Sequence, residues 1–432
     1  MGSSLQPTMG SPMTTGVTRA LRTTAQLRGH TGPRVNGIDR WLAAQLQRTV
    51  EPVGVGVELW DGSRPSTLPH RTIGDMIVGD RRTLLGLILN PELWFGEAYM
   101  AGRLQVRGPL GRVLEGLSRL SLPAGSWRER FSAGLAVPNT VNGARRNVHH
   151  HYDLGNDFYA LWLDRELVYT CAYFDTQETS LDAAQRAKLD RICRKLRLRP
   201  GESVVEAGCG WGALALHMAR HYGVHVTAFN VSGEQLKYAR VRSVREQLAD
   251  RVTFINDDYR NVSGTFDAFV SVGMLEHVGL AHFNTLAAVL RRTLRRGHGR
   301  GLLHFIGRDT PRPLNPWVRR RIFPGAYPPT LAEVFERILV PSGMSVVDVE
   351  NLRLHYAQTL AHWSERFRAA KNEVCATYGE PFRRAWELYL AGSQAAFATG
   401  WMQLFQVVFA PRESAPPSWT RDDPFDKPQR TL

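Results

Sequence analysis

Apolar residues recur with two kinds of spacing in the second half of the chain. After Pro200, short β-branched runs alternate with segments of helical spacing, which is typical of a parallel sheet flanked by helices. The sequence therefore predicts an α/β fold with a seven-stranded sheet. The expected strands are Ser203–Ala207, His225–Phe229, Val252–Asn256, Ala268–Val272, Leu302–Ile306, Ser345–Val349 and Gln406–Ala410.

The preceding part of the chain mixes the two spacings over shorter lengths. Val53–Leu59 alternates as a strand does, whereas Leu84–Leu89 and Phe95–Met100 have helical patterns. We therefore expect a small N-terminal α+β domain at residues 39–146 and a larger domain at residues 147–432.

The first 38 residues lack this patterning. They are rich in Ser, Thr, Gly and Arg and contain no acidic side chain, so residues 1–38 are expected to form a disordered tail. An Arg-rich beginning without acidic residues is also typical of organellar transit peptides, so a targeting role stays open.

The balance of charge predicts an anionic partner. The chain has 432 residues and a formal net charge of +14, which suits nucleic acid or the phosphate face of a membrane. Arginines cluster between positions 291 and 300 and again at Arg319–Arg321, beside Trp317, Ile322 and Phe323. Arginine next to large apolar side chains suits an interface, so the insertion Thr310–Pro329 is expected to be a lid or a membrane-contacting element.

Two further features indicate where the protein works. No apolar stretch approaches the roughly 18–20 residues that a membrane-spanning helix needs. The four cysteines lack CxxC spacing, which favours a reducing compartment over disulfides or a zinc site. We therefore expect a cytoplasmic protein that associates peripherally with membranes.

A glycine-rich loop follows the first expected strand. Residues Glu206 to Gly212 read E-A-G-C-G-W-G and lead into a helical segment from Ala213 to Tyr222. Glycines allow a tight turn and close approach of a ligand, and the helix N-terminus offers N–H donors. A dinucleotide site would prefer G-x-G-x-x-G and a carboxylate after the second strand, where this chain has Asn230-Val231-Ser232. The pattern favours a class I methyltransferase, with Glu206 facing the positive end of S-adenosylmethionine.

Several ordered blocks make this interpretation more specific. The blocks are His151–Tyr159, Tyr169–Phe174, Gly208–Gly212, Ser271–Gly279, Leu302–Gly307, Ile322–Gly325 and His355–Leu360. In them the chain resembles the cyclopropane-fatty-acyl-phospholipid synthase family, which includes mycolic acid cyclopropane synthases and has a class I methyltransferase Rossmann-like sheet. The resemblance covers about residues 147–410, and the hundred residues before it resemble the N-terminal domain of phospholipid-acting members.

The resemblance implies a reaction and its site. Methyl transfer from S-adenosylmethionine to a cis double bond of an unsaturated phospholipid would leave a carbocation, which loses a proton to a bound bicarbonate ion and closes a cyclopropane ring. Bicarbonate would be held by Cys171, Glu276, His304 and Tyr356 with the backbone of Ile306. The residues expected at the cofactor are Tyr169, Thr170, Glu206, Gly208, Cys209, Gly210, Trp211, Gly212, Asn230, Val231, Ser232, Gln235, Asp258, Tyr259, Arg260 and Val272.

Some details of the reaction follow less directly. The rings of Tyr173, Phe174 and Tyr356 are expected to stabilise the carbocation through their faces. Phe305 stands where the family commonly has Thr, so it is expected to reshape the acyl channel.

Other functions stay open to different degrees. The cation can also be quenched to a methyl-branched chain with the same cofactor site. Nucleic-acid methylation, or methylation of another non-lipid substrate, is disfavoured because the chain lacks the Asp/Asn-Pro-Pro-aromatic and Pro-Cys motifs.

His149–His151 cannot readily share a metal ion, because neighbouring residues of an extended segment point to opposite faces. The oligomeric state is undetermined, and a homodimer is compatible with the sequence.

Overall fold

The structure, a computed structural model, describes residues 34–65, 72–120 and 154–414. Most of the expected tail, the boundary at residue 147 and the histidine run lie outside these residues. Helix α1 (Gly37–Val50) begins within the segment predicted to be a tail, because Asn36 and Asp39 form a capping box at its start.

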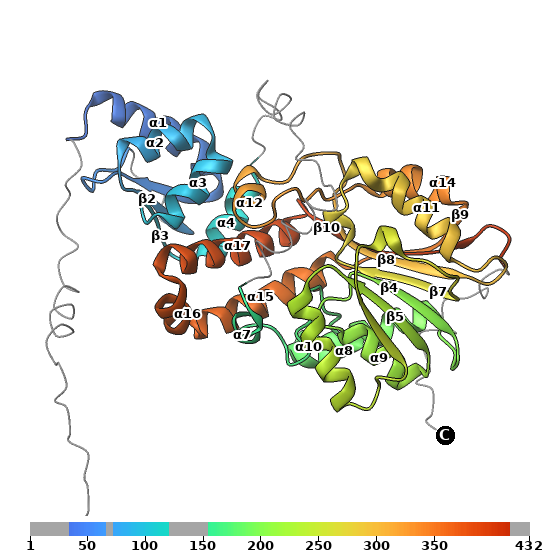
Figure 1. The fold of residues 1–432 in the computed structure, drawn as a ribbon. Helices are drawn as coiled ribbons and strands as arrows, with labels where there is room; N and C mark the ends of the chain where they lie inside the picture. Colours follow the sequence, from blue (N-terminus) through green and yellow to red (C-terminus); the bar gives the residue numbers. More distant parts are fainter. Residues whose placement is uncertain (1–33, 66–71, 121–153, 415–432) are drawn as a thin grey trace, which may run out of the picture.

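The N-terminal unit is a three-stranded sheet packed against helices (Figure 1). Strands β1 (Val55–Glu58) and β2 (Gly74–Val78) are parallel, and β3 (Leu104–Arg107) is antiparallel to β2. The strand expected from Val53 begins two residues later, because a 3-10 turn and Gly54 at φ +71° precede it. The further helices of the N-terminal unit are η1 (Glu51–Val53), α2 (Arg81–Leu89), α3 (Pro91–Met100) and α4 (Leu110–Ser118).

The larger unit is built on a seven-stranded sheet with the order β6-β5-β4-β7-β8-β10-β9. All neighbouring strands are parallel except that β10 runs antiparallel to both β8 and β9. Every expected strand is present, and the last three are longer than predicted. The strands are β4 (Ser203–Ala207), β5 (His225–Asn230), β6 (Val252–Asn256), β7 (Ala268–Val272), β8 (Arg300–Gly307), β9 (Met344–Asn351) and β10 (Gln403–Pro411).

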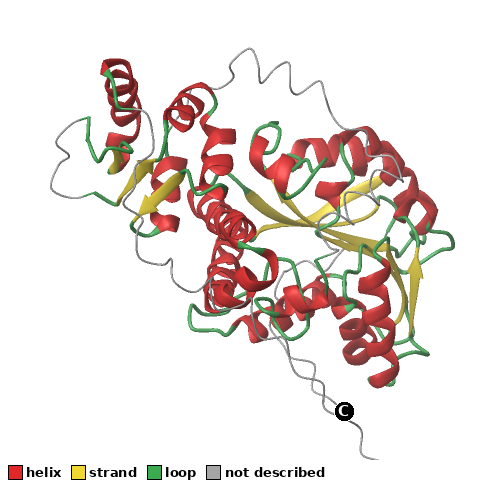
Figure 2. Ribbon diagram, turned by 60° about the vertical axis from the view of Figure 1, so that its left-hand side comes forward, coloured by secondary structure: helices red, strands yellow, loops and turns green. Residues whose placement is uncertain are grey.

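Helices cover both faces of this sheet (Figures 1 and 2). On one face, α8 (Leu181–Lys195), α9 (Ala213–Tyr222) and α10 (Gly233–Arg245) form one apolar core with the strands. On the other face, α11 (Phe283–Thr293) and η5 (Phe335–Leu339) form a second core. Strand β4 is the first strand of this sheet in the sequence, and it has β5 and β6 on one side and β7 and β8 on the other. The strand order therefore reverses at β4, which is the switch point where α/β sheets bind ligands. The short elements of this unit are η2 (Tyr259–Asn261), η3 (Leu275–His277), η4 (Leu280–His282), α13 (Leu331–Val334) and α14 (Val340–Ser342).

A third apolar core is rich in aromatic residues and lies beside the carboxyl-end loops of the sheet. It joins Phe158, Trp363 and Trp386, from helices far apart in the sequence, with Trp162 from a turn. Phe158 and Trp386 have ring centroids 4.9 Å apart at a near-perpendicular angle, which is a favourable aromatic geometry. The helices that supply this core are α7 (Asn156–Ala160), α12 (Pro316–Arg321), α15 (Arg353–Ala369), α16 (Lys371–Tyr378) and α17 (Glu380–Thr399).

The insertion between β8 and β9 joins the two units. Trp317 of α12 is buried and lies so close to Gly96 of α3 that a Cβ there would come within 2.3 Å of the indole ring. Arg321 forms a bidentate ion pair with Glu97 of α3, at 2.7 and 2.8 Å. The expectation that Trp317 and its apolar neighbours form an interfacial surface is therefore wrong for Trp317 and for Ile322, which is also buried.

The first arginine cluster largely serves the fold. Arg292 donates to the carbonyls of Arg260 and Val262, and Arg295 pairs with Asp267 at 2.9 Å. These contacts fix the end of α11 against the sheet. Among the described helices, none combines the length and the apolar character needed to cross a membrane.

Candidate active site

A cavity opens at the carboxyl ends of β4 and β5. All of the residues expected at the cofactor line it except Gly212 and Ser232. Ser232 instead caps α10 by accepting from the N–H of Gln235 at 3.4 Å. The sequence thus brings together most of the expected set at one site, and the two exceptions support the loops around it.

The glycine loop has the left-handed conformation that the sequence predicted for a tight turn. Gly208, Gly210 and Gly212 have φ values of +84°, +54° and +83°. A Cβ at Gly210 would meet no protein atom within 4 Å, because this glycine faces the cavity. A Cβ at Gly212 would lie 2.8–2.9 Å from Phe254 and Ala239. Gly210 therefore leaves room for a ligand, whereas Gly212 allows α9 to pack against its neighbours.

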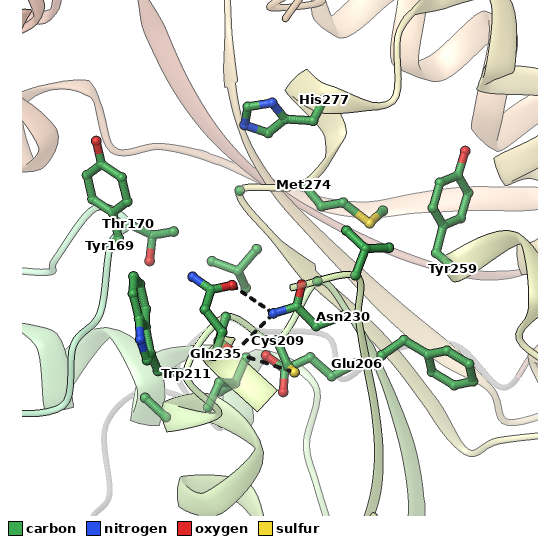
Figure 3. Close-up of a pocket in the computed structure, with 18 of the residues that line it drawn as sticks. Tyr169, Thr170, Glu206, Cys209, Trp211, Asn230, Gln235, Tyr259, Met274 and His277 are labelled. Carbon is green, nitrogen blue, oxygen red and sulfur yellow. Dashed lines mark hydrogen bonds between the residues drawn. The ribbon is translucent and has the colours of Figure 1, made fainter. Parts of the chain in front are cut away.

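Polar side chains tie the glycine loop to the next strand. The amide of Asn230 donates to the carbonyl of Gly210 at 3.1 Å and to Oε1 of Gln235 at 2.8 Å (Figure 3). Asn230 and Gln235 are both buried. Asn230 and Gln235 hold the glycine loop in place. Recognition of a ribose by these two residues would therefore be a second role beside this structural one.

A buried carboxyl and a buried amine share the floor of the cavity. Glu206 is 2% exposed, and its Oε2 has no hydrogen-bond partner among the described residues. Burial raises the pKa of Glu206 to about 8, although the Lys188 ammonium opposes this shift. Burial also lowers the pKa of Lys188 to about 8, and its Nζ donates to Oγ1 of Thr170 at 2.8 Å.

Sequence reasoning missed Lys188, although a signal was present. On α8 the buried positions include 181, 184, 185, 188, 189, 192 and 193, so Lys188 lies in the middle of the apolar stripe. A charged residue on such a stripe needs a partner or a ligand. His277 was also missed: it lines the cavity, and burial lowers the pKa of its imidazole to about 4.

The far end of the cavity follows β6. Asp258 is buried, and its carboxylate accepts from the N–H of Arg260 at 3.0 Å, which closes the turn. Asp257, which was not predicted, lines the cavity beside it. These carboxylates and the ring of Tyr259 form the part of the cavity that suits an adenine.

Aromatic side chains close the opposite side. The indole of Trp211 donates to Oδ1 of Asn156 at 2.7 Å, and the hydroxyl groups of Tyr169 and Tyr389 lie 2.7 Å apart. The ring of Tyr159 lies 5.1 Å from that of Trp211. The cofactor cavity is thereby continuous with the aromatic core.

The residues expected at the bicarbonate site lie on the far side of β7 from the glycine loop. Glu276 Oε1 accepts from the N–H of Ile306 at 2.5 Å, and burial raises the pKa of Glu276 to about 7. His304 is 1% exposed and lies two residues before Ile306 on the same strand, so both face the same side of the sheet. Burial, together with the Lys188 and Lys195 charges, lowers the pKa of His304 far below its usual value.

Cys171 and Tyr356 meet at the start of α15. Cys171 Sγ lies 3.8 Å from the carbonyl oxygen of Leu352, which also accepts from the N–H of Tyr356 at 3.1 Å. Burial raises the pKa of the Cys171 thiol, so it stays protonated. Leu352 in turn donates to the carbonyl of Leu404, which is paired with Ile306. The backbone therefore links the Cys171 and Tyr356 pair to the Glu276 and Ile306 pair.

Several described residues in this region have a buried polar atom without a hydrogen-bond partner. Among the described residues, Glu276 Oε2, His304 Nε2 and Gln406 Oε1 are buried without a hydrogen-bond partner. Folded proteins leave few such atoms, because each costs about 1–3 kcal/mol. A small polar guest with both donors and acceptors would satisfy them, and bicarbonate has that chemistry.

One expectation about the carbocation and one about the acyl channel are wrong. Tyr173 stacks on His355 with ring centroids 4.6 Å apart and has Arg191 4.3 Å from its ring centre, so its faces are already occupied. Phe305 lies in the core beneath α11 and packs against Phe405, because successive residues of a strand point to opposite faces. Phe305 therefore lies on the opposite side of β8 from His304.

Comparisons with known proteins identify the family to which the chain is similar. Residues 140–407 match the family model for mycolic acid cyclopropane synthetase. The chain is 36% identical to a probable fatty acid methyltransferase from Pseudomonas putida, over 85% of this chain and 95% of that protein. It is 41% identical to the cyclopropane-fatty-acyl-phospholipid synthase of Escherichia coli, over 60% of this chain and 66% of that enzyme.

A further relative and a solved structure extend these comparisons. The tuberculostearic acid methyltransferase of Mycobacterium tuberculosis is 35% identical, over 83% of this chain and 86% of that protein. The cyclopropane synthase MmaA2 of the same organism superposes with a TM-score of 0.58 at 31% identity, over 62% of this chain and 98% of that structure.

Proposed function

Because the chain belongs to the mycolic acid cyclopropane synthetase family, we propose that it converts cis double bonds of phospholipid acyl chains into cyclopropane rings. It is an S-adenosylmethionine-dependent methyltransferase, and its relatives act on fatty acyl chains. Two buried atoms support ring formation most directly. Glu276 Oε2 and His304 Nε2 lie beside the cofactor cavity and have no hydrogen-bond partner among the described residues.

The residues of the cavity fit the cofactor. Gly210 leaves space where a ligand must approach the backbone, and Glu206 has an unsatisfied carboxyl oxygen among the described atoms, as a site for an ammonium group requires. The cofactor supplies a methyl group on a positively charged sulfur. Glu206 and Lys188 would hold its amino-acid end, while Asp258 and Tyr259 would hold the adenine.

The proposed chemistry balances in two steps. The π electrons of the alkene form a bond to the methyl carbon, and the carbon–sulfur bond breaks with its electron pair left on sulfur. The second alkene carbon becomes a cation. Loss of a proton from the added methyl then provides the electron pair that closes the three-membered ring.

The group of residues around Glu276 suits the proton-removal step. Glu276 is held by the Ile306 N–H through one oxygen, and its other oxygen is available to orient an anion. A bicarbonate ion bound there would accept the proton without reacting with the cation as a carbon nucleophile. Tyr356, from α15, donates its backbone N–H to the same Leu352 carbonyl that Cys171 contacts, and we assign its ring to stabilisation of the cation.

A methyl-branched product is the second candidate. Two relatives that align with more than four-fifths of the chain are named as a probable fatty acid methyltransferase and a tuberculostearic acid methyltransferase. Both products share the methyl-transfer step and differ only in how the cation is quenched.

One experiment separates these products. The purified enzyme is incubated with S-adenosylmethionine carrying a CD₃ group and with vesicles of cis-unsaturated phospholipid, and the acyl chains are analysed by mass spectrometry before and after catalytic hydrogenation. A cyclopropane retains two deuterium atoms and takes up no hydrogen under mild conditions. A methylene-branched chain, formed by a hydride shift and loss of a deuteron from the added methyl group, also retains two but takes up hydrogen. A methyl-branched alkene, formed by loss of a proton from a chain carbon, retains three and takes up hydrogen. Failure to label any lipid would contradict the proposal.

Access to a phospholipid requires contact with a membrane. On the neighbouring helices α1 and α2, Trp41 is 61% exposed and Leu89 is 72% exposed. Exposed Arg40 and Arg82 accompany them. Large apolar side chains with nearby arginines suit insertion into an anionic surface, so we propose that the N-terminal unit contacts the membrane at this place.

A further inference from the structure

A glutamine occupies the centre of a largely apolar strand. Gln406 is 0% exposed and lies on β10 between Phe405 and Val407. In the sheet it is paired with His304 of β8 on one side and Glu350 of β9 on the other. A polar side chain at such a position lowers stability unless all its hydrogen bonds are formed.

The glutamine contacts one functional residue. Its Nε2 lies 3.1 Å from Nδ1 of His304, while its Oε1 has no hydrogen-bond partner in the part of the chain that the structure describes. An amide nitrogen can only donate, so Nδ1 of the neutral imidazole must accept. The single imidazole proton is then on Nε2, which is buried and has no partner among the described residues.

The tautomer determines what Nε2 can bind. With the proton on Nε2, His304 offers a donor to an anion. With the proton on Nδ1, a nitrogen lone pair would stand in place of that donor and would repel the anion. A neutral donor is needed here, since a charged imidazolium would be costly at this depth.

We propose that Gln406 is a positioning residue that fixes His304 as its Nε2–H tautomer, so that the imidazole donates to the anion that accepts the proton. This inference rests on the proposed function, because it assigns a role next to the residues proposed to hold the proton acceptor. Gln406 itself touches neither lipid nor cofactor in this proposal and acts only through His304.

A purely structural role makes a different prediction. If Gln406 served only the fold, its replacement by Leu would destabilise the protein. Gln406→Leu removes the unsatisfied Oε1 but also leaves Nδ1 of His304 without its donor, so these effects partly offset one another and the melting temperature should change by only a few degrees. Turnover should nevertheless fall by about 10–100-fold, the range in which loss of a supporting hydrogen bond to a functional histidine is felt.

The experiment compares three variants of the full-length enzyme. Gln406→Leu removes the donor, and Gln406→Glu places a carboxylate that would hold a proton on Nδ1. Gln403→Leu is the matched control, because it is a buried glutamine of the same strand that bonds Asp309 and Asn351 instead of His304. Turnover, S-adenosylmethionine affinity and melting temperature are measured for each.

A spectroscopic measurement tests the tautomer without any need for activity. In protein labelled with ¹⁵N-histidine, the His304 signals are assigned by their loss in His304→Gln. We expect Nε2 to carry the proton in the wild type, and Nδ1 to carry it in Gln406→Glu. The pH–rate profile of Gln406→Glu should also move to higher pH, since the carboxylate stabilises the imidazolium.

The outcomes separate the two proposals. If the wild type forms no cyclopropane lipid, the proposed function fails, whereas the tautomer can still be measured. If the wild type is active and Gln406→Leu turns over at the wild-type rate, or if His304 carries its proton on Nδ1 in the wild type, the role assigned to Gln406 is wrong.

Discussion

Substituting two glycines of the same loop by alanine should separate folding from cofactor binding. At Gly212 an added Cβ would lie 2.8–2.9 Å from Phe254 and Ala239, in a backbone with φ +83°. At Gly210 it would meet nothing within 4 Å, with φ +54°. The two alanines therefore share backbone strain but differ in what the new methyl group contacts.

The magnitudes follow from these contacts. A left-handed conformation costs a non-glycine residue about 1–2 kcal/mol. Overpacking at Gly212 adds about 1–3 kcal/mol, because a phenyl ring and a helix must both move. With about 2–4 °C per kcal/mol, Gly212→Ala should lower the melting temperature by roughly 4–20 °C, and Gly210→Ala by roughly 2–8 °C.

Cofactor binding should show the opposite order. The methyl group at Gly210 enters the space that the ligand needs, so the affinity for S-adenosylmethionine should fall by about 5–150-fold, the equivalent of about 1–3 kcal/mol. Gly212→Ala, measured by calorimetry well below its melting temperature, should bind within a few-fold of wild type. If Gly212→Ala loses binding while folded, or Gly210→Ala binds normally, the assignment of the loop is wrong.

Three other measurements test the site and the surface. Glu276→Gln should retain cofactor binding but lower turnover by about 10²–10⁴-fold, and wild-type turnover would make this residue structural. Because the raised pKa of Glu206 lets the folded protein hold a proton that the unfolded chain releases, stability without cofactor should decline from about pH 5 to pH 7.5. Lys188→Met removes the charge that opposes the raised pKa of Glu206, so the decline in stability should continue to a higher pH. If wild type and Lys188→Met lose stability over the same pH range in denaturation experiments, Lys188 and Glu206 are not coupled. Trp41→Ser with Leu89→Ser should weaken binding to anionic vesicles while the melting temperature stays unchanged, and unaltered vesicle binding would exclude this surface.

The sequence was informative where local chemistry determines the structure. The turn at Gly208 to Gly212 follows from glycine spacing between a strand and a helix, and the helix runs from Ala213 to Tyr222 as predicted. The family resemblance was correct, as the match of residues 140–407 confirms. The residues lining the cavity were largely found because each follows the carboxyl end of a predicted strand.

The sequence was less informative where packing between distant segments decides. Trp317 was interpreted as an interfacial residue, but Gly96 of another unit provides a flat surface that buries it. Phe305 was placed in the acyl channel, although its position one residue after His304 puts it on the opposite face of β8. Lys188 was overlooked because a lysine in a helix is usually exposed, and its burial depends on how α8 packs on the sheet.

The sheet itself explains how the methyl donor and the proposed proton acceptor could serve one substrate atom. Val272 lines the cofactor cavity at the end of β7 and is paired with His304 of β8, and the N–H of Gly273 donates to the His304 carbonyl at 2.8 Å. Adjacent parallel strands lie about 4.8 Å apart, so the cofactor cavity and the residues proposed to hold the proton acceptor are separated by little more than one strand. In the proposed reaction, a methyl group that leaves sulfur is therefore already close to the group that would remove its proton. Because this distance is set by the hydrogen bonds between strands and not by a loop, a substitution that disturbs the pairing of β7 and β8 should impair ring closure together with methyl transfer.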